Sequence, residues 1–290
     1  MMKTTHLTKS VLVSTSVLLG ATLVAALWGR KRWATGTEKI RSELEAGRVS
    51  TEPKIFRLHE LETLPAPVQR YFQSVLTDGQ PIIAAATFHH EGFLNMSETG
   101  TNWKPFTSTQ RVVTNQRGFD WDARVRMMPG LAIFIHDAYA SGRGRLQASL
   151  LGLYSMANLV DSPELNRGEM MRFFAEAVWY PTALLPSQGI SWTAIDDRAA
   201  TATLTDGEVA LTMLFRFNAE GLIDTVRAED RGRMVGKLVT PTPWQGRFRN
   251  YAVRDGMRVP LEGEVAWILP EGEQTYFYGK STSLTYEFAR

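Results

Sequence analysis

The sequence predicts a mainly β protein with a few helices, built as a large curved antiparallel meander, or unclosed barrel, with a helix against its concave face. Apolar and polar residues alternate with a period of two over most of the chain after Asp78. Gly-containing turns such as Asp206-Gly207 separate many of these segments. One segment, Asn166–Tyr180, repeats its apolar residues at helical spacing instead. That helix either fills the concave face as core or leaves a cavity there for a ligand.

An uncharged apolar run, Val11–Trp28, lies near the N-terminus. At about 1.5 Å per residue, roughly 18 helical residues reach about 27 Å, close to the hydrocarbon thickness of a bilayer. Lys3 and Lys9 precede the run, and Arg30-Lys31-Arg32 follows it at once. These features predict an uncleaved, single-pass transmembrane helix that contacts the membrane through residues 11–28. The alternative is a cleaved signal peptide, because Val24-Ala25-Ala26 offers small residues before a possible cut.

The anchor divides the chain into three predicted parts. Residues 1–33 form the membrane anchor, residues 34–54 a polar helix or stalk, and residues 55–290 a single β-rich globular domain. The side of the membrane on which this domain lies stays open. Basic residues on the two sides of the apolar run are nearly balanced, and the tight cluster after it slightly favours a cytoplasmic domain.

The charge of the chain is unevenly distributed. Residues 1–50 hold eight Lys and Arg against three Asp and Glu, whereas the remaining residues hold 24 against 27. The mildly acidic body argues against nucleic acid as a partner, because a nucleic-acid-binding domain carries its positive charge on the folded part. The chain has no cysteine, which excludes disulfides, thiolate nucleophiles, Cys-ligated zinc and a lipidated cysteine. The sequence carries no signal of the oligomeric state.

The elements of the body follow from local periodicity. A helix is expected at Pro65–Leu76, where apolar residues recur every three or four positions after two early prolines. The clearest strand is Phe119–Met127, which has apolar residues on one face and Asp or Arg on the other. The other expected strands are Ala84–Asn95, Thr107–Thr114, Leu131–Ala140, Arg143–Leu151, Ile190–Ile195, Ala199–Leu204, Val209–Phe217, Leu222–Ala228, Gly246–Arg254, Pro260–Leu269, Thr275–Lys280 and Leu284–Phe288.

The sequence contains none of the strong catalytic motifs: no nucleophile elbow, phosphate-binding loop, zincin helix motif or dinucleotide fingerprint. His89 and His90 are adjacent in an expected strand and would point to opposite faces, so they cannot both bind one metal ion. A metal site would need one of them together with His136 and a carboxylate across the sheet. We expect satisfied or exposed histidines instead, with no metal site and no cofactor. The remaining candidates for catalysis are carboxylates and one histidine, namely Asp120, Asp122, His136, Glu169 and Glu176.

Each of these charged groups has two interpretations. Asp120 and Asp122 share a strand face with Arg124 and Arg126, which is either a solvated outer face with ion pairs or the polar wall of a cavity. Glu169, Arg172 and Glu176 form a stripe along the expected helix, which either faces solvent or meets that wall. Aromatic residues beside prolines can border a pocket. The candidate ligand-binding residues are Arg124, Arg126, Arg172, Trp179, Tyr180 and Trp244.

Several long blocks of the sequence are distinctive, among them GFDWDARVRMMPGL (118–131), GEMMRFFAEAVWYPTALLPSQG (168–189) and PTPWQGR (241–247). In these blocks the chain resembles an uncharacterised bacterial family, a domain of unknown function behind an N-terminal membrane segment. The resemblance covers nearly all of residues 55–290 and carries over no activity, cofactor or catalytic residue. At the level of fold alone, the expected meander also resembles periplasmic lipoprotein carriers of the unclosed-barrel type, which favours an extracytoplasmic domain.

These observations predict a membrane-anchored, non-enzymatic β-rich domain that binds a lipid or another amphiphile. The alternative is a hydrolase-type enzyme that uses carboxylates and His136, and it requires these side chains to converge in one pocket. A scaffold protein in an envelope complex is the third hypothesis, and a large exposed apolar patch would favour it.

Overall fold

The computed structural model describes residues 4–50, 52–206, 209–236 and 238–289, and it describes side chains in the first helix only at residue 20 and from residue 23 onward. Within these residues, 13 strands form one sheet in the order β6-β5-β4-β3-β2-β1-β13-β12-β11-β10-β9-β8-β7, with antiparallel pairing throughout. The strands are β1 (Ile83–Asn95), β2 (Trp103–Val113), β3 (Gly118–Met128), β4 (Leu131–Ala140), β5 (Arg143–Leu150), β6 (Tyr154–Val160), β7 (Ile190–Asp196), β8 (Ala199–Asp206), β9 (Val209–Phe217), β10 (Ile223–Val235), β11 (Leu238–Arg254), β12 (Met257–Leu269) and β13 (Gly272–Phe288).

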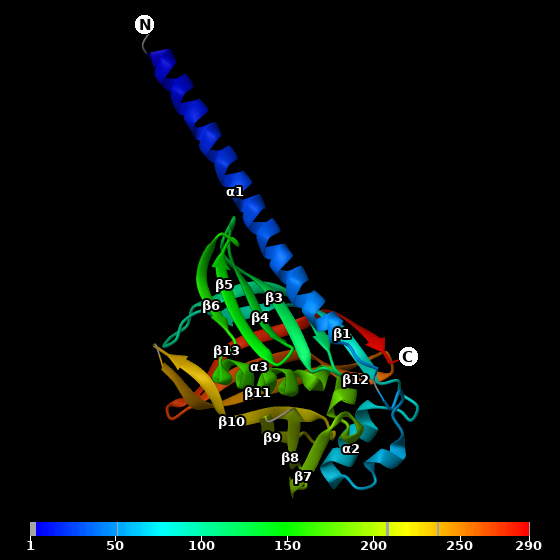
Figure 1. Cartoon of the computed structure of the whole chain (residues 1–290). Coiled ribbons are helices and arrows are strands. Elements are labelled where there is room, and N and C mark those ends of the chain that lie inside the picture. The colour runs from blue at the N-terminus through cyan, green and yellow to red at the C-terminus, as the bar shows by residue number, and fades with distance from the viewer. Residues whose placement is uncertain (1–3, 51, 207–208, 237, 290) are drawn as a thin grey trace.

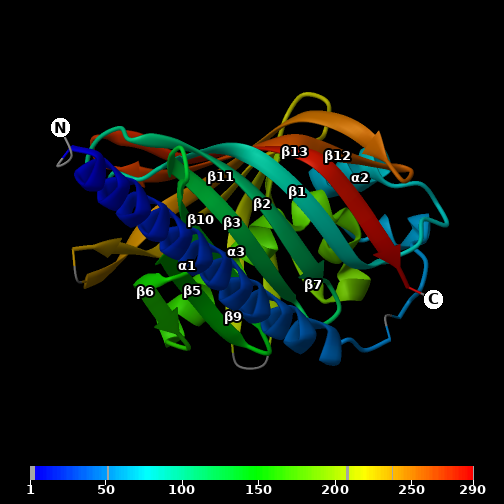
Figure 2. The same cartoon turned by 90° about the horizontal axis from the view of Figure 1, so that it is seen from above.

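The chain builds this sheet as two meanders joined by one crossover. Strands β1 to β6 run from the middle of the sheet to one edge, and β7 to β13 return from the other edge until β13 pairs with β1. The crossover between the two edges contains the helix α3 (Pro163–Glu176), which contacts strands of both meanders. The sheet curves around this helix (Figures 1 and 2). The order ends at β6 on one side and at β7 on the other, so the predicted mainly β, unclosed sheet with a helix inside it is confirmed.

The start of α3 is set by local chemistry. The Ser162 hydroxyl at the N-cap accepts a hydrogen bond from the Leu165 amide at 3.2 Å, and Pro163 occupies the first turn, where its missing amide hydrogen costs nothing. Nearly every residue of the second half of α3 is buried, because the helix lies inside the curved sheet. Three short 3-10 helices continue the crossover: η2 (Ala177–Trp179), η3 (Pro181–Leu184) and η4 (Pro186–Gln188). The predicted helix at 166–180 is therefore shifted toward the N-terminus and ends in a tighter turn.

A long helix, α1 (Thr4–Ala46), lies against the opposite, convex face of the sheet (Figure 2). It contacts β2, β3 and β4 through its C-terminal half, and its N-terminal half extends beyond the sheet (Figure 1). Thr37, Ile40 and Leu44 are buried at spacings of three and four residues, so one face of the helix meets the sheet. Gly29 allows a close approach, because a Cβ atom there would lie 2.3 Å from the carbonyl oxygen of Leu151. The polar segment after the expected anchor is thus helical as far as Ala46 and packed against the body.

The predicted transmembrane run Val11–Trp28 lies mostly outside the described side chains, which cover only residue 20 and residues 23–28 of it. In the part of the chain that the structure describes, no helix is long and apolar enough to span a bilayer. The membrane anchor, and with it the division into anchor, stalk and domain, stays a prediction.

The helix α2 (Ala66–Val75) covers the sheet near the strands β7, β8 and β12. It was expected at Pro65–Leu76 and is confirmed, with Pro65 as its N-cap residue. Val68, Tyr71, Phe72 and Val75 are buried, which accounts for the helical spacing of these apolar residues.

Two differences from the expected strands have physical reasons. No strand is expected at Tyr154–Val160, yet β6 lies there. It is an edge strand with most of its residues exposed, so it lacks the alternation that marks a half-buried strand. Two strands are expected at Thr275–Lys280 and Leu284–Phe288, but they form the single strand β13. The small polar residues between them weaken the apolar pattern without ending the pairing with β1.

A row of glycines crosses the middle of the sheet. Gly92 on β1 pairs with Gly279 on β13, which pairs with Gly263 on β12. Trp179 of η2 lies directly on Gly263, because a Cβ atom there would come within 2.7 Å of the indole ring. Glycine in a strand interior permits such a close approach from another element. This contact holds the end of the crossover against the concave face, and Trp179 and Gly263 both line the cavity there.

Candidate functional site

A cavity of about 190 Å³ lies between α3 and the concave face of the sheet. Side chains from both meanders converge on it, because the crossover places α3 between them. Most of its lining is apolar and aromatic. The apolar and aromatic lining residues include Leu94, Trp121, Ile135, Leu146, Ala175, Trp179, Trp244, Phe248, Val265, Tyr276 and Phe277.

Charged residues lie at one side of this apolar cavity. The Arg172 guanidinium on α3 forms ion pairs with Asp137 on β4 and, at 2.8 Å, with Glu176 one turn further along the helix. Gln110 donates a hydrogen bond of 2.6 Å to the second oxygen of Glu176. Arg172 also lies 5.0 Å from the ring centre of Trp121. This arginine is therefore fully paired within the chain, as a buried charge has to be.

Arg231 on β10 and Glu169 on α3 form a looser pair beside it. The shortest distance between their charged groups is 3.8 Å, and both side chains are nearly buried. Burial, together with the nearby Asp137 carboxylate, raises the pKa of Glu169 well above its usual range. The Arg231 guanidinium lies 4.8 Å above the ring of Trp244, whose indole N–H donates a hydrogen bond of 2.8 Å to the Tyr276 hydroxyl.

A second hollow of about 540 Å³ adjoins the first and shares four lining residues with it, namely Asp137, Leu146, Arg231 and Tyr276. It lies between the edge strand β6, the start of α3 and the β10–β11 hairpin. Four of its apolar lining residues are more than 40% exposed, namely Leu159, Val160, Met234 and Val239. The outer hollow is therefore apolar at the surface and adjoins the inner cavity at residues that include the charged Asp137 and Arg231.

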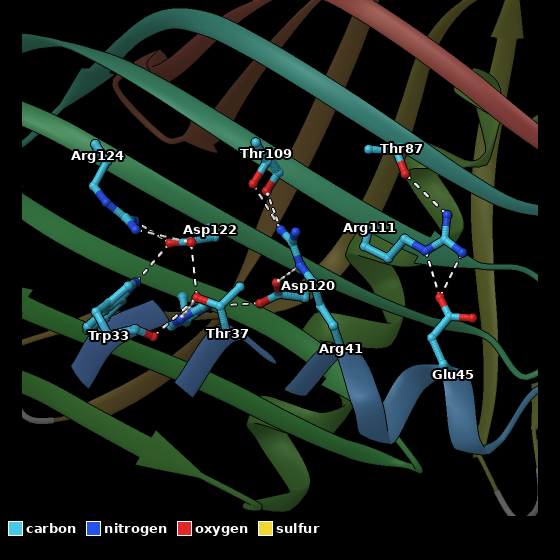
Figure 3. A network of polar contacts seen from close by, with 11 residues as sticks. Trp33, Thr37, Arg41, Glu45, Thr87, Thr109, Arg111, Asp120, Asp122 and Arg124 are labelled. Carbon is cyan, nitrogen blue, oxygen red and sulfur yellow. Dashed lines mark hydrogen bonds and ion pairs between the residues drawn. The ribbon is translucent and has the colours of Figure 1, made fainter. Parts of the chain in front are cut away.

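The convex face carries a separate buried network beneath α1 (Figure 3). The His136 Nδ1 atom lies 2.9 Å from Asp120 Oδ1, and Nε2 lies 3.1 Å from the Thr37 hydroxyl. Arg41 donates a hydrogen bond of 2.9 Å to the other oxygen of Asp120. The ring of Trp33 stacks on the His136 imidazole at 4.5 Å. Three turns of α1 are thus held to the sheet through β3 and β4.

Asp122 extends this network toward the N-terminal side. It accepts a hydrogen bond of 2.8 Å from the Trp33 indole, lies 3.1 Å from the Thr37 hydroxyl and pairs with Arg124. Burial opposes its ionisation, but the hydrogen bond from Arg124 and the nearby His136 outweigh burial and lower the pKa of Asp122. Arg124 also lies 4.2 Å above the ring of Phe134.

The order Asp120, His136, Thr37 resembles the connectivity of a carboxylate–histidine–hydroxyl triad, but the surroundings do not suit catalysis. The Thr37 hydroxyl has three neighbours that can accept its one proton: His136 Nε2, Asp122 Oδ2 and the Trp33 carbonyl oxygen. None of the main hollows formed by the described residues is lined by any of the three triad-like side chains. A nucleophile needs room for a substrate and donors for an oxyanion. The network therefore holds α1 against the convex face of the sheet.

The structure divides the five candidate catalytic residues between the two faces of the sheet. Asp120, Asp122 and His136 lie beneath α1 on the convex face, whereas Glu169 and Glu176 lie on the concave face with the cavity. On the charged face of the strand at 119–127, α1 covers Asp120 and Asp122, whereas Arg124 and Arg126 line a groove beside that helix. The convergence that the hydrolase hypothesis requires is absent among these residues.

The candidate ligand-binding residues divide in the same way. Arg172, Trp179 and Trp244 line the concave cavity. Arg124 belongs to the network beneath α1, and Arg126 is exposed in a groove beside that helix. Tyr180 is fully buried and donates a hydrogen bond of 2.6 Å to the Phe173 carbonyl, so it holds the crossover together.

His89 and His90 point to opposite faces, as expected for neighbours in a strand: His89 is exposed and His90 is buried. Burial, with a contribution from Arg172, lowers the pKa of His90 to about 3. Within the described residues, no group of three or more His, Asp or Glu side chains is placed to hold a metal ion.

Three important residues were not selected from the sequence. Asp137 and Arg231 line the cavity, and Thr37 lies at the centre of the convex network. A signal for the helix contact existed: Trp33, Thr37 and Leu44 recur at helical spacing within a segment interpreted as a stalk. The cluster of arginines in the C-terminal third of the sequence includes Arg231 without distinguishing it from the others, and no local signal marks Asp137, because the meeting of the two depends on the crossover.

The fold and these two sites can be compared with known proteins. No curated protein matches the sequence significantly. A crystal structure of a LolA superfamily protein from Nitrosomonas europaea is similar to this chain with a TM-score of 0.37 and 10% sequence identity, over 86% of this chain and 93% of that one. Residues 62–286 match the model of a family of unknown function, DUF6920. Because this match spans most of the chain and confirms the resemblance noted above, the protein belongs to the DUF6920 family of unknown function.

Proposed function

We propose that the protein binds a lipid or another amphiphile in the concave cavity. The observation that carries this proposal is an apolar, aromatic-lined space of about 190 Å³ inside the sheet, with charged groups at one side. An apolar cavity of roughly 150 Å³ in another protein stays dry and takes up benzene, so a space of this size accommodates an apolar group. The mixture of an apolar lining with few polar groups is typical of small-molecule sites.

The outer hollow supports binding of a molecule larger than the inner cavity. Its volume of about 540 Å³ brings the combined space into the range of about 300–1,000 Å³ that small-molecule sites occupy. The exposed apolar side chains around it would contact the part of the ligand that enters last. A ligand with a long apolar chain suits this shape better than a compact polar substrate.

We further propose that residues 11–28 anchor the protein in a membrane, where such ligands are abundant. The apolar run with basic residues on both sides supports this, and α1 extends away from the sheet (Figure 1). Extraction of membranes with alkaline carbonate tests it. The full chain should remain in the membrane pellet, whereas a variant with Leu18→Arg and Leu19→Arg should be released. Release of the wild-type chain would overturn the anchor.

Ligand binding can be tested with a substitution that fills the cavity without straining the fold. Gly246 on β11 lines the cavity, and a Cβ atom there would meet its nearest neighbours at an ordinary distance of 3.6 Å. Gly246→Leu should therefore place its side chain in the cavity, and Gly246→Ala is the matched control. The purified full chain is titrated with N-phenyl-1-naphthylamine, whose fluorescence rises in apolar surroundings.

The wild type and Gly246→Ala should bind the probe, and Gly246→Leu should bind it at least about tenfold more weakly, because the cavity space is occupied. Circular dichroism and thermal unfolding check that all three proteins fold. Equal affinity in a folded Gly246→Leu protein, or no binding by the wild type, would show that the cavity does not take up amphiphiles.

A further inference from the structure

Arg231 is a buried guanidinium that borders the cavity without a close ionic partner among the described residues. Its side chain is 11% exposed, and it lines both the inner cavity and the outer hollow. The nearest carboxylate oxygen, on Glu169, is 3.8 Å away, and the Nη1 atom of Arg231 is buried without a hydrogen-bond partner in the described structure. A buried guanidinium without a full set of acceptors destabilises the folded protein, so a ligand that supplies an acceptor would offset this desolvation penalty.

The two arginines at the cavity differ in their ionic partners. Arg172 pairs with two carboxylates, Asp137 and Glu176, and is balanced within the chain. Glu169 does not balance Arg231 in the same way, because burial and the Asp137 carboxylate raise the pKa of Glu169 and favour its neutral form. The cavity thus contains one arginine that is satisfied and one that is not.

The surroundings of Arg231 leave its donors available to a ligand. The guanidinium carbon of Arg231 lies 4.8 Å from the centre of the Trp244 ring and so contacts one face of it. The Trp244 N–H donates its hydrogen bond to the Tyr276 hydroxyl. The indole N–H of Trp121, which also lines the cavity, is a second buried donor without a partner in the described structure. Two carboxylate oxygens there, Asp137 Oδ1 and Glu169 Oε2, are also buried without a partner, and the raised pKa of Glu169 favours a protonated carboxyl that can itself donate. Such a set of donors matches a group with several acceptor oxygens, and a planar guanidinium suits carboxylate or phosphate in particular.

We propose that the amphiphile bound in this cavity carries an anionic head group, a carboxylate or a phosphate, that pairs with Arg231. Its apolar chain then lies among the aromatic side chains of the inner cavity, with Phe248 and Phe277 among them. This inference rests on the proposed amphiphile binding and adds the chemical class of the head group.

The test compares four probes that share an unbranched chain of ten carbons and differ in the head group: decanoate, whose tenth carbon is the carboxylate carbon, decyl phosphate, decan-1-ol and decyltrimethylammonium. The affinity of each probe is measured by its displacement of N-phenyl-1-naphthylamine from the full chain at neutral pH. We expect at least one of the two anions to bind about ten- to hundred-fold more tightly than decan-1-ol, as a charge-assisted hydrogen bond would give. The better of the two anions then identifies a carboxylate or a phosphate head.

Arg231→Gln removes the charge and keeps a hydrogen-bonding side chain, so the affinity for the anion should fall to that of decan-1-ol while the affinity for decan-1-ol stays unchanged. Arg231→Lys should keep part of the preference for the anion. Arg227→Gln is the matched control on the same strand, because Arg227 pairs with the exposed Glu229 at 2.6 Å and lines neither hollow. This control should bind all four probes as the wild type does.

The outcomes separate the two proposals. If none of the four probes displaces the dye, amphiphile binding itself fails. If decan-1-ol or the cationic probe binds as tightly as the anions, or if Arg231→Gln keeps the preference for the anion, amphiphile binding stands and the anionic head group is wrong. If Arg231→Gln does not fold, the ranking of the four probes on the wild type decides.

Discussion

The Nδ1 atom of His136 lies 2.9 Å from the Oδ1 atom of Asp120, and both side chains are buried between the sheet and α1. Arg41 from the helix pairs with the second oxygen of the same carboxylate at 2.9 Å. Asp120 therefore joins two strands of the sheet to the N-terminal helix. A carboxylate in this position contributes to stability only while its partners remain in place.

Replacing Asp120 by Asn should destabilise the protein by about 2–3 kcal/mol, because the charge that holds Arg41 and His136 is lost while both partners remain. Arg41 is partly exposed, so water compensates for some of the loss. The free energy of unfolding from urea titrations measures this. Glu229→Gln, at an exposed ion pair, is the control and should change stability by less than about 1 kcal/mol. Equal effects of both substitutions would contradict a structural role for the network.

The buried His90 should make the protein less stable in acid. Its pKa is lowered to about 3 in the folded protein, whereas an unfolded histidine titrates near about 6.5. Between these values the unfolded chain binds one more proton, so the stability falls as the pH falls, by up to about 1.4 kcal/mol per pH unit from this group. His90→Leu should remove this slope between about pH 6 and 4, and His89→Leu on the exposed face of β1 should keep it. Identical pH profiles for all three proteins would contradict the prediction.

Gly263→Ala should destabilise the fold by about 1–3 kcal/mol, because the added methyl group would lie 2.7 Å from the Trp179 ring. Trp179 cannot move away easily, since its N–H donates a hydrogen bond of 2.9 Å to the Pro260 carbonyl. Thermal unfolding measures the loss. Gly246→Ala, where the nearest contact is 3.6 Å, should cost much less. A Gly263→Ala protein as stable as the Gly246→Ala protein would mean that the Trp179 ring does not pack directly against Gly263.

Ser162→Ala should cost about 1 kcal/mol, because the first turn of α3 loses the side-chain acceptor for the Leu165 amide. Ser162→Asp should retain most of the stability, since a carboxylate is also a good N-cap and suits the positive end of the helix. Chemical denaturation of the three proteins measures the order. Ser155→Ala, on the exposed strand β6, is the control and should have little effect.

The local elements of the body were largely predictable from the sequence. The alternation at 119–127 and at 209–217 reports which residues share a face of a strand, and both strands are present nearly as expected. The prediction failed where the pattern is weak. Edge strand β6 has no buried face to impose alternation, and β13 contains small polar residues at its centre.

The candidate site was only partly predictable, because periodicity does not say what covers a face. Asp120, Asp122 and Arg124 were recognised as one charged face, but α1 covers it through contacts such as that of Thr37 with His136, which are 99 residues apart in the chain. Glu169 and Glu176 were recognised as one stripe with Arg172, but the sequence did not show that each also has a partner in the sheet, Arg231 on β10 and Gln110 on β2.

Short-range pattern in the amino-acid sequence thus accounts for the strands, the helices, the family blocks and the charge asymmetry of this chain. The crossover and the docked helix account for the rest. The sheet lies between α3 and α1, so charged residues that are close in sequence are divided between a cavity on the concave face and a buried network on the convex face. Such a separation depends on contacts between residues far apart along the chain. The entropic cost of closing these long loops is offset by burial of apolar surface only when the whole sheet has formed.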